Sequence, residues 1–244
     1  MNYVFNFGVF FQELPGGGEE YWQLIVSGVY WTLAVSACSW IIALALGSVI
    51  GTIRTTTSPW LVRLGNAWVE FFRNIPLLVQ MFLWYFVVPE FIPPLKSWIV
   101  HTDPANAQFI SAVLCLGLFT SARIAEQVRA GIQSLPRGQR YAGLATGLTL
   151  VQTYRYVLLP VAYRIIIPPL TSESMNIIKN TSVAFAVSIA ELTMFAMQAQ
   201  EETSRGIEIY LAVTGLYFIS AFAVNRIAAL IERRVQIPGM LGAK

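Results

Sequence analysis

Residues 133–160 read QSLPRGQRYAGLATGLTLVQTYRYVLLP and lie between two strongly apolar parts of the chain. The segment is basic, because it contains Arg137, Arg140 and Arg155. Basic connecting segments of membrane proteins lie on the cytoplasmic side. This segment is also longer and more regularly patterned than a simple connector. It therefore predicts a cytoplasmic segment with a structure of its own.

The spacing within this segment predicts a helix of about three turns over residues 138–150. Small side chains, including Ala142 and Ala145, lie near one face, and leucines lie near another. Such a helix can lie in a groove of a partner protein, with its apolar residues as anchors. It can equally rest on the membrane surface, and the pattern alone leaves both interpretations open.

The composition of the whole chain is that of a membrane protein. Of the 244 residues, 56% are apolar and 12% are charged, whereas soluble domains have about 25% charged residues. Residues 21–53 contain no Asp, Glu, Lys or Arg. A membrane-spanning helix needs roughly 20 mostly apolar residues. These observations exclude a soluble fold.

Apolar runs and proline positions predict an all-α membrane protein with five spans. The expected spans cover about residues 22–50, 65–88, 108–125, 165–190 and 207–229. The expected domains are an outside tail at 1–21, a transmembrane domain at 22–231 and an inside tail at 232–244. Cys38 and Cys115 fall within spans and are expected to pack there as thiols.

The distribution of basic residues orients these spans. Most arginines fall in residues 54–73, in residues 129–164 and at the carboxyl end, whereas only Lys96 and Arg205 fall in the alternate loops. Basic residues accumulate on the cytoplasmic side. We therefore expect a periplasmic amino terminus and a cytoplasmic carboxyl terminus.

The fourth expected span is unusually polar. At about 100° per residue, Glu173, Asn176 and Asn180 lie within about 60° of one another, and Lys179 lies on an adjacent face. Ionisable groups inside a membrane are costly and face the bundle interior or water. We expect this helix to line a translocation path. A buried polar network that fixes helix packing is the alternative.

Two local predictions concern this region. Pro168 and Pro169 are expected to interrupt the start of the fourth span, because proline lacks an amide donor. Arg123 and Glu126 are three residues apart and share a helical face. They are expected to form an ion pair, with a gating role open for Arg123.

Motifs for catalysis are missing from the sequence. It contains no G-x-x-x-x-G-K-[ST] loop to hold nucleotide phosphates and no H-E-x-x-H or Cys/His cluster. We therefore expect no enzymatic activity, no metal and no cofactor in this chain. The arginines are interpreted as markers of topology, so nucleic-acid binding is not expected.

The cytoplasmic segment resembles the signature of ABC importer permeases. That signature reads E-A-A, three residues, glycine, nine residues and I-x-L-P. Gly147 and residues 157–160 (VLLP) reproduce its second part, with valine for isoleucine. Residues 141–143 (YAG) replace E-A-A, so the family's glutamate is missing here.

Further blocks extend the resemblance over nearly the whole chain. Residues 71–80 (FFRNIPLLVQ), 122–129 (ARIAEQVR), 134–139 (SLPRGQ) and 179–182 (KNTS) resemble blocks of polar amino-acid permeases. Residues 154–160 (YRYVLLP) most resemble permeases of glutamate/aspartate importers.

The resemblance implies a type I ABC importer in the bacterial inner membrane. Its implied partners are cytoplasmic ATP-binding-cassette subunits that use ATP and Mg, a second homologous but different permease, a periplasmic amino-acid-binding protein and membrane lipid. The segment around Gly147 would be the coupling helix that fits a groove on the ATPase. The coupling residues would be Gly138, Gln139, Ala142, Ala145, Gly147 and Pro160.

Two other functions stay open at this point. A stand-alone, ion-coupled secondary amino-acid transporter is disfavoured by the lack of a visible internal repeat. A membrane-anchored scaffold is disfavoured by the polar fourth span.

Overall fold

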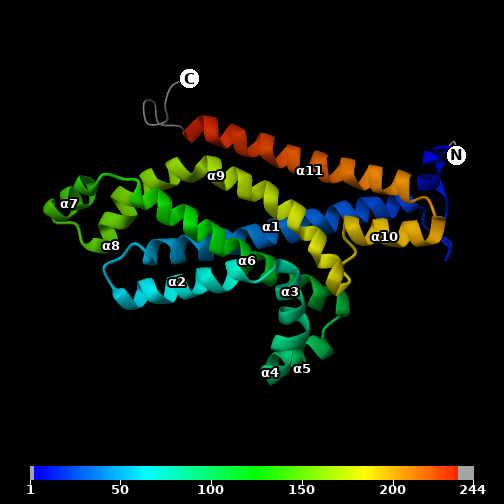
Figure 1. Cartoon of the computed structure of the whole chain (residues 1–244), viewed down its shortest axis with the longest axis horizontal. Helices are drawn as coiled ribbons and strands as arrows, with labels where there is room; N and C mark the ends of the chain where they lie inside the picture. The colour runs from blue at the N-terminus through cyan, green and yellow to red at the C-terminus, as the bar shows by residue number, and fades with distance from the viewer. Residues whose placement is uncertain (1–2, 236–244) are drawn as a thin grey trace. The chain divides into compact units, whose positions relative to one another are not determined.

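The computed structural model describes residues 3–235, which form helices joined by short turns (Figure 1). The α-helices are α1 (Tyr21–Ile53), α2 (Pro59–Asn74), α3 (Leu77–Phe82), α4 (Val88–Phe91), α5 (Pro93–His101), α6 (Pro104–Gln133), α7 (Arg137–Ala145), α8 (Leu150–Thr153), α9 (Leu159–Asn180), α10 (Leu192–Thr203) and α11 (Gly206–Val235). Tighter or wider turns form η1 (Phe7–Phe11), η2 (Leu83–Val87), η3 (Tyr154–Leu158) and η4 (Thr181–Val187). The all-α prediction is confirmed. Residues 236–244 of the expected inside tail lie outside the described residues.

The helices α1, α6 and α11 are each long and apolar enough to cross a membrane. The count of possible spans in the described chain rises to five if each of two interrupted helix pairs crosses once. This agrees with the number of spans expected from the sequence. The side of the membrane that each terminus faces stays a prediction.

The second expected span is not one continuous helix. The helix α2 begins at Pro59, inside the segment expected to be a loop between the first two spans. Proline suits the first helical turn, because the amide group that it lacks would have no hydrogen-bond acceptor within the helix. The helix ends at Asn74, and Ile75 is extended with a ψ of 130°. The ring of Pro76 disfavours helical backbone at the residue before it. Residues 65–88 are therefore divided between α2, α3 and η2.

The fourth expected span, in contrast to the second, begins as a continuous helix where an interruption was predicted. The helix α9 contains Pro168 and Pro169 without ending, so the predicted interruption is wrong. Packing offsets the lost hydrogen bonds, because Ala162 and Ile166 are buried just before the prolines. The chain then leaves the helix at η4 and reaches Ser188, which is left-handed with a φ of 62°. The helix α10, which follows, was missed.

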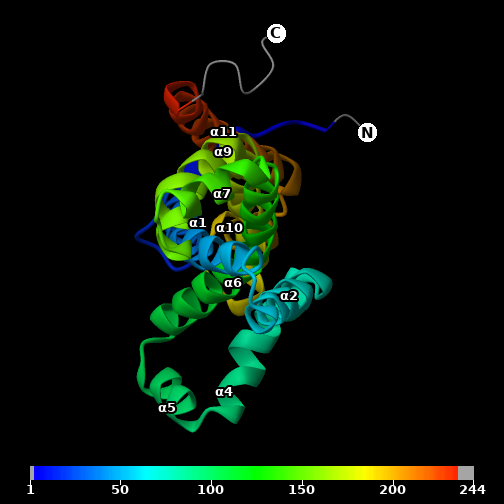
Figure 2. The ribbon, with the colours of Figure 1, turned by 90° about the vertical axis from the view of Figure 1, so that its left-hand side faces the viewer.

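The chain divides into two compact units. The first unit comprises Met1–Ser39, Pro76–Leu116 and Asn176–Ala223, and the second comprises Trp40–Ile75, Gly117–Met175 and Val224–Lys244. In the first unit, the chain turns between α4 and α5 before it enters α6 (Figure 2).

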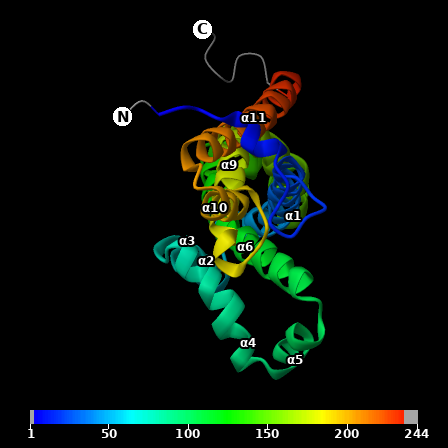
Figure 3. The same cartoon turned by 90° about the vertical axis from the view of Figure 1, so that its right-hand side faces the viewer.

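The amino-terminal segment of the first unit lies against the start of α11 (Figure 3). The buried carboxylate of Glu208 accepts hydrogen bonds from the Tyr3 hydroxyl and, at 2.9 Å, from the Asn6 amide. Tyr21 donates a 2.6 Å hydrogen bond to Glu202 of α10. The predicted outside tail is therefore held to the unit by buried and partly buried polar contacts.

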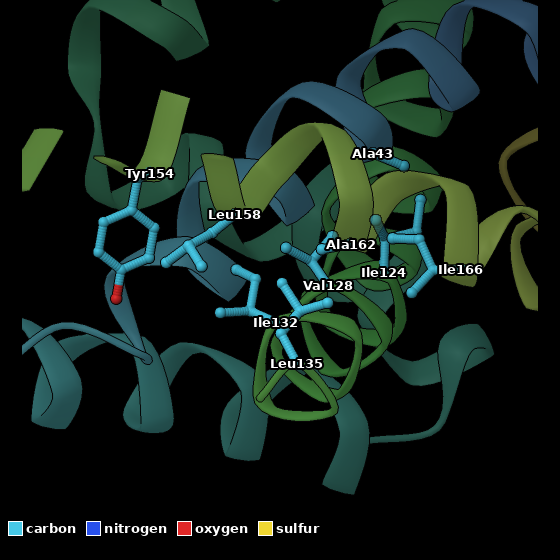
Figure 4. Close-up of a cluster of buried hydrophobic side chains, with 9 residues drawn as sticks. All are labelled: Ala43, Ile124, Val128, Ile132, Leu135, Tyr154, Leu158, Ala162 and Ile166. Atoms are coloured by element: carbon cyan, nitrogen blue, oxygen red, sulfur yellow. The ribbon is translucent and has the colours of Figure 1, made fainter. Parts of the chain in front are cut away.

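The second unit has an apolar core built from α1, α6, η3 and α9 (Figure 4). Ile124, Val128 and Ile132 of α6 face Leu158 and Ala162 across it (Figure 4). This core positions the polar and basic side chains described below.

Glycines bring α1 and α6 close together within this unit. A Cβ atom added at Gly47 would lie 2.7 Å from Ile124 Cβ, and one at Gly51 would lie 2.7 Å from the Ala125 carbonyl oxygen. A G-x-x-x-G pair permits such close approach of helices in membranes.

Candidate functional site

An ion pair joins α6 to α9 in the second unit. Arg123 Nη1 lies 3.3 Å from Glu173 Oε2. The predicted Arg123–Glu126 pair is wrong. Glu126 instead lies 2.7 Å from Arg54 Nη2 and 3.5 Å from Arg73 Nη1. Although Arg123 and Glu126 share a helix, each pairs with a group outside it: Arg123 with Glu173 of α9, and Glu126 with Arg54 in the turn after α1 and with Arg73 of α2.

The surroundings of this pair suit an accessible charge more than a structural bridge. The Arg123 side chain is 43% exposed and that of Glu173 is 13% exposed. The Arg123 guanidinium also lies over the Phe119 ring, 5.7 Å from its centroid. Exposed ion pairs contribute about 0–1 kcal/mol to stability. The arrangement can hold a cationic group in place where a charged solute reaches it.

The other predicted path residues occupy the last turns of α9, in the first unit. Lys179 is exposed, whereas Asn176 and Asn180 are partly buried. Among the described residues, no carboxylate lies within ion-pair distance of Lys179. Its ammonium group is therefore available to an anionic solute.

The predicted helix over residues 138–150 is shorter in the structure. The helix α7 ends at Ala145, and Gly147 has a φ of +86°. The Leu148 amide donates to the Gly143 carbonyl at 3.2 Å, and the Gly147 amide donates to the Leu144 carbonyl at 3.1 Å. These bonds form a Schellman motif, which ends a helix at a left-handed glycine. The coupling role of this segment stays a prediction.

A second short helix folds back on α7 and forms a hairpin with it (Figure 1). Thr149 starts α8 with a capping box, in which its hydroxyl accepts from the Gln152 amide. A Cβ atom at Gly143 would lie 2.8 Å from Thr153 Cγ2, so glycine permits the close packing of the two helices.

The outer surface of this hairpin is apolar and exposed. Tyr141 is 66% exposed and Val151 is 75% exposed. The exposed residues of the predicted coupling segment also include Gly138, Ala142, Leu144, Ala145, Gly147 and Pro160, while Gln139 is partly buried. An unpartnered apolar surface of this kind is typical of a protein contact.

Sequence reasoning missed the charged group around Arg54. This side chain is 4% exposed, and its Nε donates a 2.8 Å hydrogen bond to Asn66. From the sequence, Arg54 is only a marker of topology. Its position directly after a long apolar run indicates the end of a helix, and it does not reveal the contacts with Asn66 of α2 and Glu126 of α6.

Comparison with known proteins assigns the chain to a family. The model of the family described as binding-protein-dependent transport system inner membrane component matches residues 27–237. The chain belongs to this family. It is therefore an inner-membrane transport component and not an enzyme, and membership argues against the ion-coupled carrier that the sequence left open.

Individual relatives support this assignment. The chain is 46% identical to the glutamate/aspartate import permease protein GltJ of Escherichia coli strain K12 over the full length of both chains. It is 33% identical to the probable glutamine ABC transporter permease protein GlnM of Bacillus subtilis strain 168, covering 78% of this chain and 83% of the relative.

A solved structure supports the same fold. The chain aligns with the crystal structure of an amino acid ABC transporter with histidines at a TM-score of 0.74 and 29% identity. The alignment covers 88% of this chain and 95% of that one. The predicted fold of a type I ABC transporter membrane domain is confirmed.

Proposed function

We propose that this chain is the permease subunit of an ATP-driven importer that moves glutamate and aspartate from the periplasm to the cytoplasm. The 46% identity to the glutamate/aspartate permease over the whole of both chains carries this proposal. Its membrane domain covers residues 22–231, with the amino terminus in the periplasm and the carboxyl terminus in the cytoplasm.

The energy for transport comes from other subunits. Cytoplasmic ATP-binding-cassette subunits hydrolyse ATP with Mg, and the α7–α8 hairpin passes their movement to this chain. Support for this role comes from the exposed apolar surface around Tyr141 and Val151. A second, homologous permease completes the membrane pathway, and a periplasmic binding protein delivers the amino acid.

The path residues have distinct roles in this proposal. Lys179 attracts the substrate carboxylates, while Asn176 and Asn180 offer hydrogen bonds beside it. Arg123 of α6 and Glu173 of α9 form a charged pair that also contacts the substrate. The available ammonium of Lys179 and the accessible Arg123 support these roles.

The substrate is tested with the complete complex in liposomes. ATP hydrolysis is measured after adding the binding protein loaded with glutamate, aspartate or glutamine. We expect stimulation by the two acidic amino acids and little by glutamine. Equal stimulation by glutamine would contradict the proposed substrate, and no stimulation by any of them would contradict the importer itself.

A further inference from the structure

A cavity of about 550 Å³ lies in the second unit, beside the turn that follows α1. Its walls come from this turn, the first turns of α2, the end of α6, the start of α7 and η3. Three arginines line it, Arg54, Arg137 and Arg140, and its lining contains no aspartate or glutamate. The cavity is therefore a basic site that belongs neither to the predicted path nor to the apolar surface of the hairpin.

Arg54 is buried, and not all of its hydrogen-bond donors have a partner. Its Nε and Nη2 atoms reach Asn66 and Glu126, but Nη1 is buried without a hydrogen-bond partner. Glu126 also lies 3.5 Å from Arg73, so one carboxylate serves two guanidinium groups. A buried donor without a partner is destabilising, so a ligand that accepts a hydrogen bond from Nη1 would be favoured here.

The two arginines of α7 add uncompensated charge. The Nε atom of Arg140 is buried without a partner. Among the described residues, neither Arg137 nor Arg140 lies within ion-pair distance of a carboxylate. Guanidinium groups match the geometry of phosphate oxygens and can bind them with paired hydrogen bonds. The cavity thus offers the donors and charge that a phosphate group requires.

The adjacent surface indicates where this phosphate comes from. Val62 of α2 lines the cavity, and its neighbours Trp60, Leu61 and Leu64 are exposed by 77%, 40% and 61%. A phospholipid could place its phosphate in the cavity against the arginines while its acyl chains contact the exposed apolar side chains of α2. Basic segments beside the cytoplasmic leaflet attract anionic lipids.

We propose that this cavity binds the phosphate of an anionic phospholipid from the cytoplasmic leaflet. The bound phosphate offsets part of the positive charge of the arginines, and it joins the start of α7 to the ends of α1 and α6. The proposal rests on the orientation given under the proposed function, but not on the substrate or on transport.

The test is native mass spectrometry of the complete transporter complex, purified in detergent and mixed with phosphatidylglycerol or phosphatidylcholine. We expect retained phosphatidylglycerol and little phosphatidylcholine. The double variant Arg137→Ala/Arg140→Ala should lower phosphatidylglycerol binding roughly 25-fold, since each of the two cations contributes about a fivefold attraction. The matched control Arg155→Ala/Arg164→Ala removes two exposed arginines outside the cavity and should keep binding within about twofold.

If the double variant does not assemble, the single variant Arg137→Ala replaces it, because this side chain is exposed. It should weaken phosphatidylglycerol binding by about fivefold. Equal retention of both lipids, or binding unchanged by Arg137→Ala, would overturn the proposal.

Two further measurements test whether the cavity binds free phosphate or an acidic side chain of the ATPase instead of a lipid. Inorganic phosphate that displaces phosphatidylglycerol at equal concentration would overturn the lipid source. Loss of the ATPase subunit from the double variant, with lipid retention unchanged, would show that the cavity holds an acidic side chain of that partner. A complex that retains the lipid but does not transport would count against the proposed function alone.

Discussion

At the scale of single residues, the Arg123–Glu173 pair distinguishes a transport role from a structural one. A partly exposed ion pair contributes about 0–1 kcal/mol to stability, so its loss barely affects folding. We expect Glu173→Gln to lower uptake about tenfold, the effect of losing one charged contact in the path, while the melting temperature of the complex changes little.

The matched control for this variant is Glu90→Gln. Glu90 forms an exposed ion pair with Lys96 at 2.6 Å, outside the predicted path. Uptake by Glu90→Gln should equal that of the unmodified chain. If the two variants reduced uptake equally, Glu173 would have no particular part in the path.

Gly147 tests the coupling surface at the same scale. Its φ of +86° makes any side chain strained, by roughly 1–2 kcal/mol, yet a Cβ atom there would meet no atom of this chain within 4 Å. Gly147→Ala therefore adds strain alone, whereas Gly147→Arg adds strain and bulk on the outer surface. We expect the arginine variant to retain several-fold less ATPase on purification than the alanine variant. Equal retention would place the partner contact elsewhere.

At the scale of helices, the packing of α1 on α6 depends on small residues. Alanine at Gly51 would place its Cβ atom 2.7 Å from the Ala125 carbonyl oxygen. We expect Gly51→Ala to destabilise the chain by about 1–3 kcal/mol through overpacking, seen as a lower melting temperature. Gly215→Ala in α11 is the control, because nothing lies within 4 Å of its added Cβ. A lower melting temperature for both variants would show that crowding is not the cause.

Local sequence signals predicted the long helices and missed the breaks. The apolar runs gave α1, α6 and α11 because their hydropathy alone requires a helix in a membrane. The stop at Gly147 could have been predicted, because glycine is the preferred residue after a helix end. The continuity of α9 through Pro168 and Pro169 could not, because it depends on burial against α6.

The candidate site was predictable to a similar extent. Helical periodicity placed Glu173, Asn176 and Lys179 on one helix, as the structure has them. The choice of partner for Arg123 could not be predicted, because Glu173 is 50 residues away in the chain and approaches only through tertiary packing.

At the scale of the whole molecule, the orientation in the membrane is a testable consequence of the charge distribution. A Cys-free chain, with Cys38 and Cys115 replaced, is expressed without its ATPase in cells whose outer membrane is permeable. A maleimide that does not cross the inner membrane should label Lys96→Cys and leave Ala145→Cys unlabelled until the cells are lysed. Labelling of Ala145→Cys in intact cells would place the α7–α8 hairpin in the periplasm.

The central claim is that this chain is a passage whose energy is supplied by a separate ATPase. The most direct measurement is uptake of labelled glutamate by liposomes that contain the two permeases and the ATPase, with the binding protein outside. We predict uptake only with ATP and Mg inside the liposomes, and none with a sodium or proton gradient alone. Uptake driven by an ion gradient without ATP would contradict the account.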